Sequence, residues 1–329
     1  MKPKELQSII SQFKKKRITV LGDVGVDRYT FGAVERISPE APVPIVQVFE
    51  EKHKLGLAAN VADNIATLGG TPVLVGLIGR DGVAQELKQL MKSARVGSLT
   101  LVTDPARRTS LKERIVSDRQ QLLRVDYEST HHPKKNVQSA LVKKVISSLS
   151  KSQALIIEDY AKGMMTKEMI AQVIRAAKKS GVLTLVDPNA KSTLDMYQGA
   201  DVITPNRREA EALVGFKVQS EKDLLEAGSI MLSEVGGEHV FITLGKDGMA
   251  IFSRGGKKAI HIPTYAREVY DVSGAGDTVI ATLALALSSG ASIHEAAMIA
   301  NLAAGVVVGK RGTATVTPKE LAQMMSEVL

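Results

Sequence analysis

The feature that most constrains the fold of this chain is a repeated alternation between short apolar runs and segments of helical periodicity. The apolar runs, rich in β-branched residues, lie at 17–23 (RITVLGD), 71–79 (TPVLVGLIG), 154–159 (ALIIED), 182–187 (VLTLVD), 201–206 (DVITPN) and 239–245 (HVFITLG). Helical segments are predicted at 58–68, 82–94, 134–149 and 166–179, and later at 275–289, 293–308 and 318–328. Strands that are apolar along their whole length are typical of a parallel sheet between helix layers. The sequence therefore predicts an α/β fold with a mostly parallel central sheet flanked by helices on both faces.

Two stretches depart from this alternation. Residues 28–50 and 107–127 alternate apolar and polar side chains at period two without an intervening helix, as in VPIVQVFE and TSLKERIV. Such alternation is typical of strands with one exposed face. We expect these stretches to form a small β-sheet lid on a single domain that spans residues 1–329. The alternative is an edge extension of the main sheet that carries no function.

Composition excludes several classes of function. The chain has no cysteine, so it has no disulfides, no thiolate metal site and no cysteine nucleophile. The first twenty residues are charged throughout, and no 18-residue apolar stretch lacks a charge. We therefore expect no signal peptide, no membrane partner and a cytoplasmic location. The formal net charge is +8, but lysine and arginine are spread along the chain, which favours a small anionic substrate over nucleic acid.

The stretch at 271–287, DVSGAGDTVIATLALAL, places two glycines and an acid at the start of a predicted helix. A helix amino terminus leaves backbone N–H groups without partners and carries a partial positive charge, so it attracts anions. Gly274 and Gly276 leave room for a phosphate to approach. Asp277 in the first turn either complements the helix dipole or takes part in chemistry on that phosphate.

Two better-known glycine motifs do not fit. A P-loop requires G-x-x-x-x-G-K-[ST], whereas GVVVGKR at 305–311 is one residue short and lacks the hydroxyl. The dinucleotide fingerprint fails because GAGDTV lacks the third glycine and lies too near the carboxyl terminus. A carboxylate beside an amide-lined pocket suits phosphoryl transfer, in which an acid accepts the proton of the attacking hydroxyl. We therefore predict that Asp277 is this base.

These residues also resemble a known signature. DVSGAGD resembles the carboxyl-terminal signature D-T-x-G-A-G-D of the PfkB (ribokinase-like) carbohydrate kinase family, with Val272 in place of the threonine. GLAANVADNIATLGG at 56–70 is similar to the family's first signature, with Leu57 where a second glycine is usual. The resemblance implies a ribokinase-like fold, ATP and Mg²⁺ as cofactors, and allows a monovalent cation near the anion hole. The amides of that anion hole would come from Gly274, Ala275 and Gly276.

Further matches concern the nucleotide. TPNRREAEALVG at 204–215 resembles the family's N-x-x-E element, in which Asn206 and Glu209 would organise Mg²⁺ and the phosphates through water. The alternative is that this pair forms a capping box at a helix start. ITLGKDG at 242–248 resembles the nucleotide loop, and the alternative is a hairpin turn. NLAAGVVVGKRGTATV at 301–316 would lie against adenine, although small residues on a helix are also typical of close packing. The ATP-binding residues implied in the last two segments are Thr243, Gly245, Gly248, Asn301 and Gly305.

Several blocks resemble one group within the family, the kinases of bacterial ADP-heptose synthesis. They are GDVGVDRY (22–29), RISPEAPVPIVQV (36–48), RQQLLRVDYE (119–128), EDYAKGMM (158–165) and AAGVVVGKRGTATVTPKEL (303–321). Kinases of this group transfer a phosphoryl group from ATP to the anomeric hydroxyl of D-glycero-β-D-manno-heptose 7-phosphate, in the route to the lipopolysaccharide core. The implied sugar-binding residues are Asp27, Gly56 and Asn60, and the implied cations for the 7-phosphate are Lys162, Arg107 and Arg108.

The sequence leaves two alternative functions open and predicts an oligomeric state. The substrate could instead be fructose phosphate, ribose or a nucleoside, as in other PfkB kinases. The chain could also be a sugar-binding regulator that kept the fold and lost turnover. The exposed edge strands expected in the lid, together with the resemblance, predict a homodimer formed through the lid.

Overall fold

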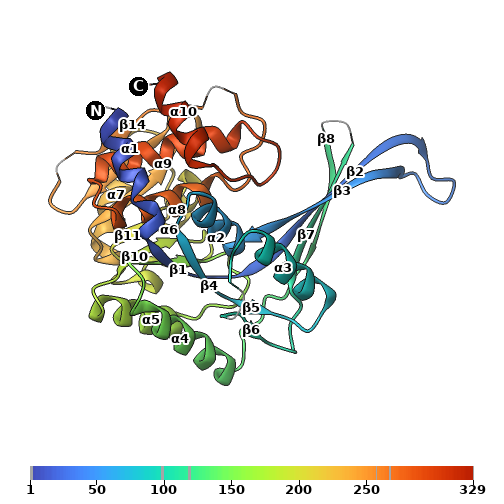
Figure 1. The fold of residues 1–329 in the computed structure, drawn as a ribbon, viewed down its shortest axis with the longest axis horizontal. Coiled ribbons are helices and arrows are strands. Elements are labelled where there is room, and N and C mark those ends of the chain that lie inside the picture. The colour runs from blue at the N-terminus through green and yellow to red at the C-terminus, as the bar shows by residue number, and fades with distance from the viewer. Residues whose placement is uncertain (1–2, 98–99, 118–119, 257, 267, 329) are drawn as a thin grey trace.

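An eight-stranded sheet forms the middle layer of the structure, in the order β14-β13-β12-β11-β10-β9-β1-β4 (Figure 1). The computed structural model describes residues 3–97, 100–117, 120–256, 258–266 and 268–328. The parallel strands are β1 (Arg17–Gly22), β4 (Thr71–Val75), β9 (Ala154–Glu158), β10 (Leu183–Asp187), β11 (Val202–Ile203) and β12 (His239–Thr243). Two strands, β13 (Met249–Ser253) and β14 (Ile260–Ile262), add antiparallel pairings at one edge. The mostly parallel sheet predicted from the apolar runs is confirmed.

Helices cover both faces of this sheet, as the apolar strands require. One layer contains α1 (Pro3–Ser11), α2 (Ala58–Thr67), α3 (Gly82–Ser93), α8 (Ala275–Ser288), α9 (Ile293–Val308) and α10 (Pro318–Val328). The other layer contains α4 (Lys135–Leu149), α5 (Lys167–Lys179), α6 (Arg207–Val214) and α7 (Glu221–Val235). Three short 3₁₀ turns complete the described elements: η1 (Phe13–Lys15), η2 (Leu194–Tyr197) and η3 (Gly245–Asp247). No helix in the described ranges is both long and apolar enough to cross a membrane.

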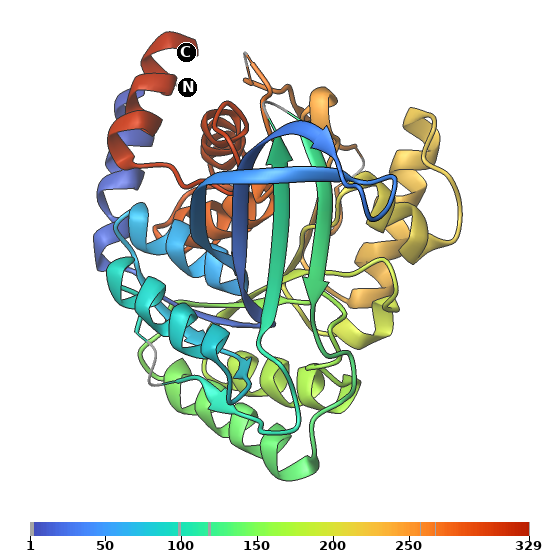
Figure 2. The ribbon, with the colours of Figure 1, turned by 90° about the vertical axis from the view of Figure 1, so that its right-hand side faces the viewer.

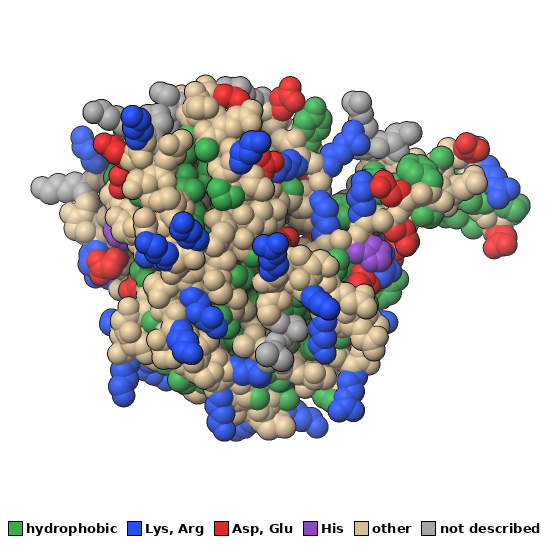
Figure 3. Space-filling model, viewed as in Figure 1, with side chains coloured by type: hydrophobic (Ala, Val, Ile, Leu, Met, Phe, Trp, Pro, Cys, Tyr) green, Lys and Arg blue, Asp and Glu red, His purple; other side chains and the backbone are tan. Residues whose placement is uncertain are grey.

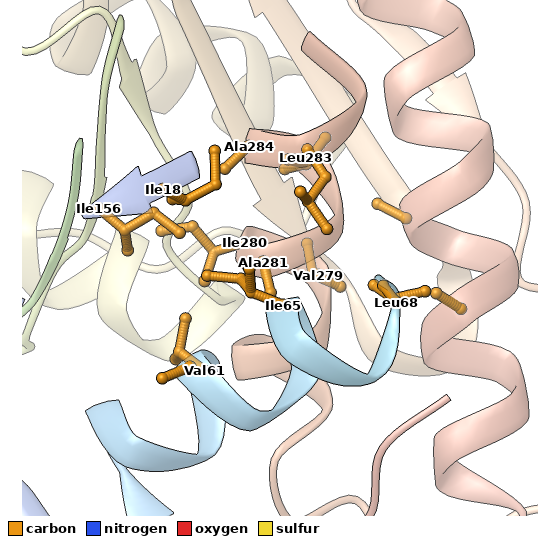
Figure 4. Close-up of a cluster of buried hydrophobic side chains, with 14 of the residues drawn as sticks. Ile18, Val61, Ile65, Leu68, Ile156, Val279, Ile280, Ala281, Leu283 and Ala284 are labelled. Carbon is orange, nitrogen blue, oxygen red and sulfur yellow. The ribbon is translucent and has the colours of Figure 1, made fainter. Parts of the chain in front are cut away.

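Helix α2 packs against α8 above strands β1 and β9 (Figure 4). The contact is made by fully buried aliphatic side chains, with Val61 and Ile65 on α2, Ile280 on α8, Ile18 on β1 and Ile156 on β9. Burying one such side chain contributes about 1.5–3 kcal/mol. Because this packing fixes the two helices side by side, their first turns lie together at the carboxyl ends of the strands.

A second sheet, in the order β3-β2-β7-β8, projects from the body (Figures 1 and 2). Its strands are β2 (Val24–Ile37), β3 (Pro44–Leu57), β7 (Ser110–Ser117) and β8 (Gln120–Tyr127). It is a sheet of its own, not an edge extension of the main one, and a separate short pair is formed by β5 (Leu77–Ile78) and β6 (Val102–Thr103). Strands β2 and β3 extend beyond the predicted stretch 28–50 at both ends, and β7 and β8 lie within the predicted stretch 107–127. Residues 118–119 of that prediction lie outside the described residues.

Gly22 couples the main sheet to both sides of the strand-end region. It ends β1, lies opposite Glu158 of β9, and faces the first residue of α2. A Cβ placed on Gly22 would lie 2.5 Å from the Cβ of Ala58 and 2.7 Å from the Cβ of Glu158. Both distances are shorter than van der Waals contact. A side chain here would therefore push α2 away from β9.

We expect Gly22→Ala to lower the free energy of unfolding by about 1–3 kcal/mol, because overpacking forces the backbone to shift. The measurement is urea unfolding followed by circular dichroism. The matched control is Gly82→Ala at the first residue of α3, where an added Cβ meets no atom within 4 Å. An unfolding free energy for Gly22→Ala equal to that of the control would contradict this packing.

Candidate active site

Asp277 lies in the first turn of α8, three residues after the N-cap residue, which has a left-handed conformation. That residue, Gly274, has φ 79° and serves as the helix N-cap. A Cβ on Gly274 would lie 2.7 Å from the Nδ2 of Asn60, so glycine is needed here for space as well as for backbone conformation. In the predicted anion hole, the Ala275 N–H donates to the carbonyl of Val272 at 3.2 Å. One of its three amides is thus engaged in the turn itself.

Two donors hold the carboxylate of Asp277. The amide of Asn60, in the first turn of α2, donates to Oδ2 at 2.6 Å. The hydroxyl of Tyr160, in the loop after β9, donates to Oδ1 at 2.8 Å. Burial raises the pKa of Asp277 above its usual value, and these two hydrogen bonds oppose that rise. A carboxyl group with a raised pKa is a better proton acceptor than a free aspartate.

More acids gather at the carboxyl ends of neighbouring strands. Glu158 ends β9 and is 1% exposed, and Asp187 ends β10 and accepts a hydrogen bond from Thr204 Oγ1 at 3.1 Å. Burial raises the pKa of both well above the usual range. The charges of Asp277 and Glu209 add to the rise for both acids. Such mutual repulsion is relieved when a cation binds nearby, so this region is electrostatically suited to one.

A largely apolar cavity of about 430 Å³ lies beside the first turn of α8. Ala275 and Gly276 line it together with five residues that the sequence implied for ATP, namely Thr243, Gly245, Gly248, Asn301 and Gly305. Gly248 has φ 85°, and a Cβ there would overlap the carbonyl oxygen of Ile262. The loop at 242–248 is also the connection between antiparallel strands β12 and β13, so the hairpin interpretation describes its geometry. Asn301 donates from Nδ2 to the carbonyl of Pro263 at 2.7 Å.

Asn206 and Glu209 form a complete capping box at the start of α6. Asn206 Oδ1 accepts from the Glu209 N–H at 3.1 Å, and Glu209 Oε2 accepts from the Asn206 N–H at 2.8 Å. The capping alternative is therefore present in the structure. The capping box is compatible with a place in the site. The backbone of Asn206 forms a β-bridge with Thr243 at the cavity edge, and the charge of Glu209 raises the pKa of Asp187. Burial raises the pKa of Glu209 itself.

The inner ends of β2 and β3 bring the predicted sugar-side residues beside Asp277. Asp27 is 3% exposed and accepts from Arg114 at 2.8 Å, and a Cβ on Gly56 would lie 3.1 Å from the Asp27 carboxyl carbon. Leu57 follows with φ 58° and ψ −141°, a conformation that favours glycine, and α2 begins at the next residue. The glycine usual at this position is thus replaced by a strained leucine. Asp27, Gly56 and Asn60 consequently lie together, and the charge of Asp27 raises the pKa of Asp277.

The three cations predicted for a remote phosphate have different surroundings. Arg107 is 8% exposed, donates to the carbonyl of His131 at 2.6 Å and lies 4.0 Å from Asp23, whose pKa burial raises to about 7. Lys162 pairs with Glu128 of the loop after β8 at 2.7 Å. Arg108 is exposed and lies 5.4 Å from the ring of Tyr127. The roles of all three in phosphate binding stay predictions.

Sequence reasoning did not identify Tyr160 as part of the site. The residue lies within EDYAKGMM, where the resemblance implied a role for Lys162 alone. A signal was available, because Tyr160 follows the last residue of an apolar strand by two positions and ligands of open α/β sheets bind at the carboxyl ends of strands. Its contact with Asp277 spans 117 residues of sequence and could not be read from local pattern.

Comparisons with known proteins show the family and the fold of this chain. The profile described as pfkB family carbohydrate kinase matches residues 15–320. "Bifunctional protein HldE" of Pelobacter propionicus is 39% identical over 321 residues, which are 98% of this chain and 65% of that protein. "Bifunctional protein HldE" of Caulobacter vibrioides is 44% identical over 310 residues, 94% of this chain and 63% of that protein. This chain thus spans about two thirds of the length of these curated relatives.

Solved structures share the fold. Arabidopsis thaliana ribokinase complexed with ribose and ATP superposes with a TM-score of 0.75 at 20% identity, covering 94% of this chain and 98% of that one. Escherichia coli phosphofructokinase-2 in complex with substrates and products gives 0.79 at 19% identity, covering 95% and 99%. The ribokinase-like fold implied by the sequence is confirmed, and the chain belongs to the pfkB family of carbohydrate kinases.

Proposed function

We propose that this chain is an ATP-dependent kinase that phosphorylates the anomeric hydroxyl of D-glycero-β-D-manno-heptose 7-phosphate to give the 1,7-bisphosphate. The observation that carries the proposal is the place of Asp277, which stands between an apolar cavity suited to a nucleotide and a polar group of sugar-side residues, Asp27 and Asn60. The sequence blocks shared with the heptose kinases, and 39–44% identity to proteins named bifunctional HldE, support this sugar. The product would serve ADP-heptose and lipopolysaccharide core synthesis in the cytoplasm.

The cavity beside α8 and α9 suits adenine, and its end at Gly276 suits the phosphates. An apolar lining with few polar groups is typical of nucleotide base sites. The amino terminus of α8 then faces the γ-phosphate, where its N–H groups and partial positive charge stabilise the oxygens of the transferred group. No covalent intermediate with the protein is needed.

The chemical step is an in-line displacement. The anomeric oxygen forms a bond to the γ-phosphorus as the bond to the β,γ-bridging oxygen breaks, and the bond's electron pair leaves with ADP. The proton of the anomeric hydroxyl passes to the carboxylate of Asp277. Asn60 and Tyr160 keep that carboxylate in place, and its raised pKa favours the transfer.

The donor set near α6 fits a magnesium ion held partly through water. In the described part of the chain no three His, Cys, Asp or Glu side chains converge as direct ligands of one metal. Mg²⁺ commonly uses only one or two carboxylates together with waters and substrate phosphates, and Glu209 with Asn206 can supply oxygen donors of this kind. When bound, the ion would neutralise charge on the β- and γ-phosphate oxygens. A monovalent cation near the α8 turn remains part of the proposal only by family resemblance.

The sugar phosphate would lie under the projecting sheet. Asp27, oriented by Arg114, is suited to accept hydrogen bonds from sugar hydroxyls, and Gly56 leaves room for the ring to approach the backbone. Lys162 is suited to the remote phosphate because its ammonium already meets an anionic partner, Glu128, that a phosphate could replace. Arg108 and Arg107 are the further candidates.

We expect Asp277→Asn to lower kcat by about 10²–10⁴-fold with ATP affinity nearly unchanged, because the amide cannot accept the proton. ADP release with heptose 7-phosphate is the measurement, and calorimetry gives ATP binding. The matched control is Asp63→Asn, an acid on α2 whose described side-chain hydrogen bond is with Thr67 and not with the site. An Asp277→Asn enzyme as active as this control would refute the base assignment.

The same assay tests the substrate. Wild type should prefer heptose 7-phosphate over fructose 6-phosphate, ribose and nucleosides, and Lys162→Met should raise KM for the phosphorylated heptose more than for the unphosphorylated one. Turnover of another sugar in preference would identify a different pfkB kinase. Sugar binding without any turnover in the wild type would identify a regulator.

We also propose a homodimer formed through the projecting sheet. Exposed apolar side chains follow this sheet and its hairpin connection: Ile37, Val43, Val48, Phe49, Leu122 and Leu123. Phe49 is 72% exposed, and Figure 3 shows apolar side chains along the projecting arm. Both outer strands, β3 and β8, are edges. A second copy with the same surface would cover these groups by a two-fold contact.

Light scattering is expected to give twice the chain mass of 35.2 kDa for wild type and the single mass for Phe49→Asp. A charge buried at the contact would prevent association. Ile146→Asp is the control, because Ile146 is exposed on α4 of the body, away from the sheet. A wild type of single-chain mass would overturn this assembly.

A further inference from the structure

Tyr160, in the loop that follows β9, donates a hydrogen bond to Asp277, and the family resemblance assigned this tyrosine no role. We propose that Tyr160 is a positioning residue that fixes the orientation of the Asp277 carboxylate and sets the pH range in which it works as the base. The proposal rests on the proposed kinase function. It assigns to Tyr160 no contact with sugar or nucleotide.

The geometry of the carboxylate is the first argument. Tyr160 donates to Oδ1 at 2.8 Å and Asn60 donates to Oδ2 at 2.6 Å. The two donors come from different elements, the loop after β9 and the first turn of α2, and they meet the two oxygens from separate directions. Rotation of the carboxylate would break at least one of these bonds. Proton transfer requires the acceptor to be held in place, so fixing both oxygens favours the reactive geometry.

The rigidity of the loop is the second argument. Asp159 accepts hydrogen bonds from Tyr197 at 2.7 Å, from Ser192 at 2.8 Å and from the Ala161 N–H at 2.9 Å. Ala161 has φ 53°, a conformation that L-residues adopt at a cost. Gly163 has φ 77°, and a Cβ there would overlap the carbonyl of Thr130. Strained backbone persists where its surroundings determine it, so the loop holds Tyr160 firmly toward Asp277.

The chemistry of the hydroxyl is the third argument. Burial raises the pKa of Tyr160 well above its usual value, and the charges of Asp277 and Glu158 add to this rise. The hydroxyl therefore keeps its single hydrogen at physiological pH. That hydrogen goes to Asp277, whereas Oε1 of the buried Glu158 has no hydrogen-bond partner among the described residues. The hydroxyl therefore hydrogen-bonds Asp277, and it also opposes the rise in the pKa of the neighbouring Glu158.

The charges around Asp277 decide the direction of the pH effect. Asp27 on β2, Glu158 on β9 and Asp187 on β10 repel its negative charge, and Glu209 on α6 acts on the last two. Burial, followed by the charge of Asp27, raises the pKa of Asp277, while the hydrogen bonds from Asn60 and Tyr160 lower it. Removing the hydroxyl of Tyr160 must therefore raise the pKa further. Activity needs the ionised base. As the pH falls, the variant would therefore lose activity at a higher pH than wild type does.

We expect Tyr160→Phe to lower kcat at pH 7 about tenfold or more and to move the acid limb of the kcat profile upward by about one pH unit. KM for ATP should change less than twofold. The comparison variant is Tyr197→Phe, which removes a hydroxyl–carboxylate bond to Asp159 in the same loop but keeps the hydroxyl that donates to Asp277. It should move the acid limb less than Tyr160→Phe does, because it acts on the base only through the loop.

A second variant keeps the ring hydroxyl and should move the acid limb of the kcat profile in the opposite direction. Site-specific 3-fluorotyrosine at position 160 is a stronger hydrogen-bond donor, so it should move the acid limb to lower pH. This variant covers the case in which Tyr160→Phe does not fold. An acid limb that stays in place in both variants would overturn the proposal, because a merely structural role changes stability and not the titration of the base.

Titration of ¹³C-labelled aspartate carboxyls by NMR separates this proposal from the proposed function. The midpoint of Asp277 should be higher in Tyr160→Phe than in wild type, with no substrate present. Equal midpoints would refute the role of Tyr160 even in an active kinase. A wild type that phosphorylates no sugar would refute the kinase function, while the shift in midpoint would still establish the contact.

Discussion

The packing of α2 against α8 above β1 and β9 is the constraint on which the rest of the site depends. It places the first turns of two helices, separated by 217 residues of sequence, close enough for Asn60 to donate to Asp277. The contact is possible because glycine occupies two crowded positions, Gly22 beneath α2 and Gly274 beside the Asn60 amide. Aliphatic burial drives this packing, and the polar contact follows from it. A core made of small and branched side chains thus fixes the position of Asn60 relative to Asp277.

The same region contains several energetically unfavourable features, namely buried like charges and strained backbone. Buried acids at the ends of β9 and β10 repel one another and Asp277, and Leu57 and Ala161 hold positive φ angles. Each strained residue costs about 1–3 kcal/mol, and such costs cluster at functional sites. The acids would gain most from the arrival of a cation with the nucleotide. The apolar cavity, the acids and the helix terminus therefore lie together around the α8 turn.

The sequence predicts much of this architecture because strands buried on both faces need a continuous apolar run. Helices α2, α3, α4, α5, α8, α9 and α10 follow from that pattern within one residue at each end, while β4 and β11 are shorter than the predicted runs 71–79 and 201–206. Helix α7 was not predicted, although Ser220 and Asp223 form a capping box and Gly236 ends the helix, which are readable signals. Its apolar positions include a glycine that packs under Phe252 and weakens the periodicity. The projecting sheet was predicted, but β2 and β3 reach further into the body, where their pairing continues to Val24 and Leu57.

The site was predictable only where chemistry is local in sequence. Asp277 and its flanking glycines form a motif within four residues, and the cavity residues follow from loops of the same family pattern. Tyr160 and the buried partners of Arg107 depend on contacts between distant segments, which no local pattern records. Arg107 lies 4.0 Å from Asp23, a contact within the body that the lid pattern did not predict.

In the proposed reaction the amino terminus of α8 holds the transferred phosphoryl group while Asp277 receives the sugar's proton. A crystal structure with a non-hydrolysable ATP analogue, Mg²⁺ and heptose 7-phosphate tests this arrangement. The terminal phosphate should lie about 2.7–3.2 Å from backbone N–H groups of the α8 turn, with the anomeric oxygen between it and the Asp277 carboxylate. A terminal phosphate bound away from that turn, or a sugar whose anomeric oxygen does not reach Asp277, would contradict it.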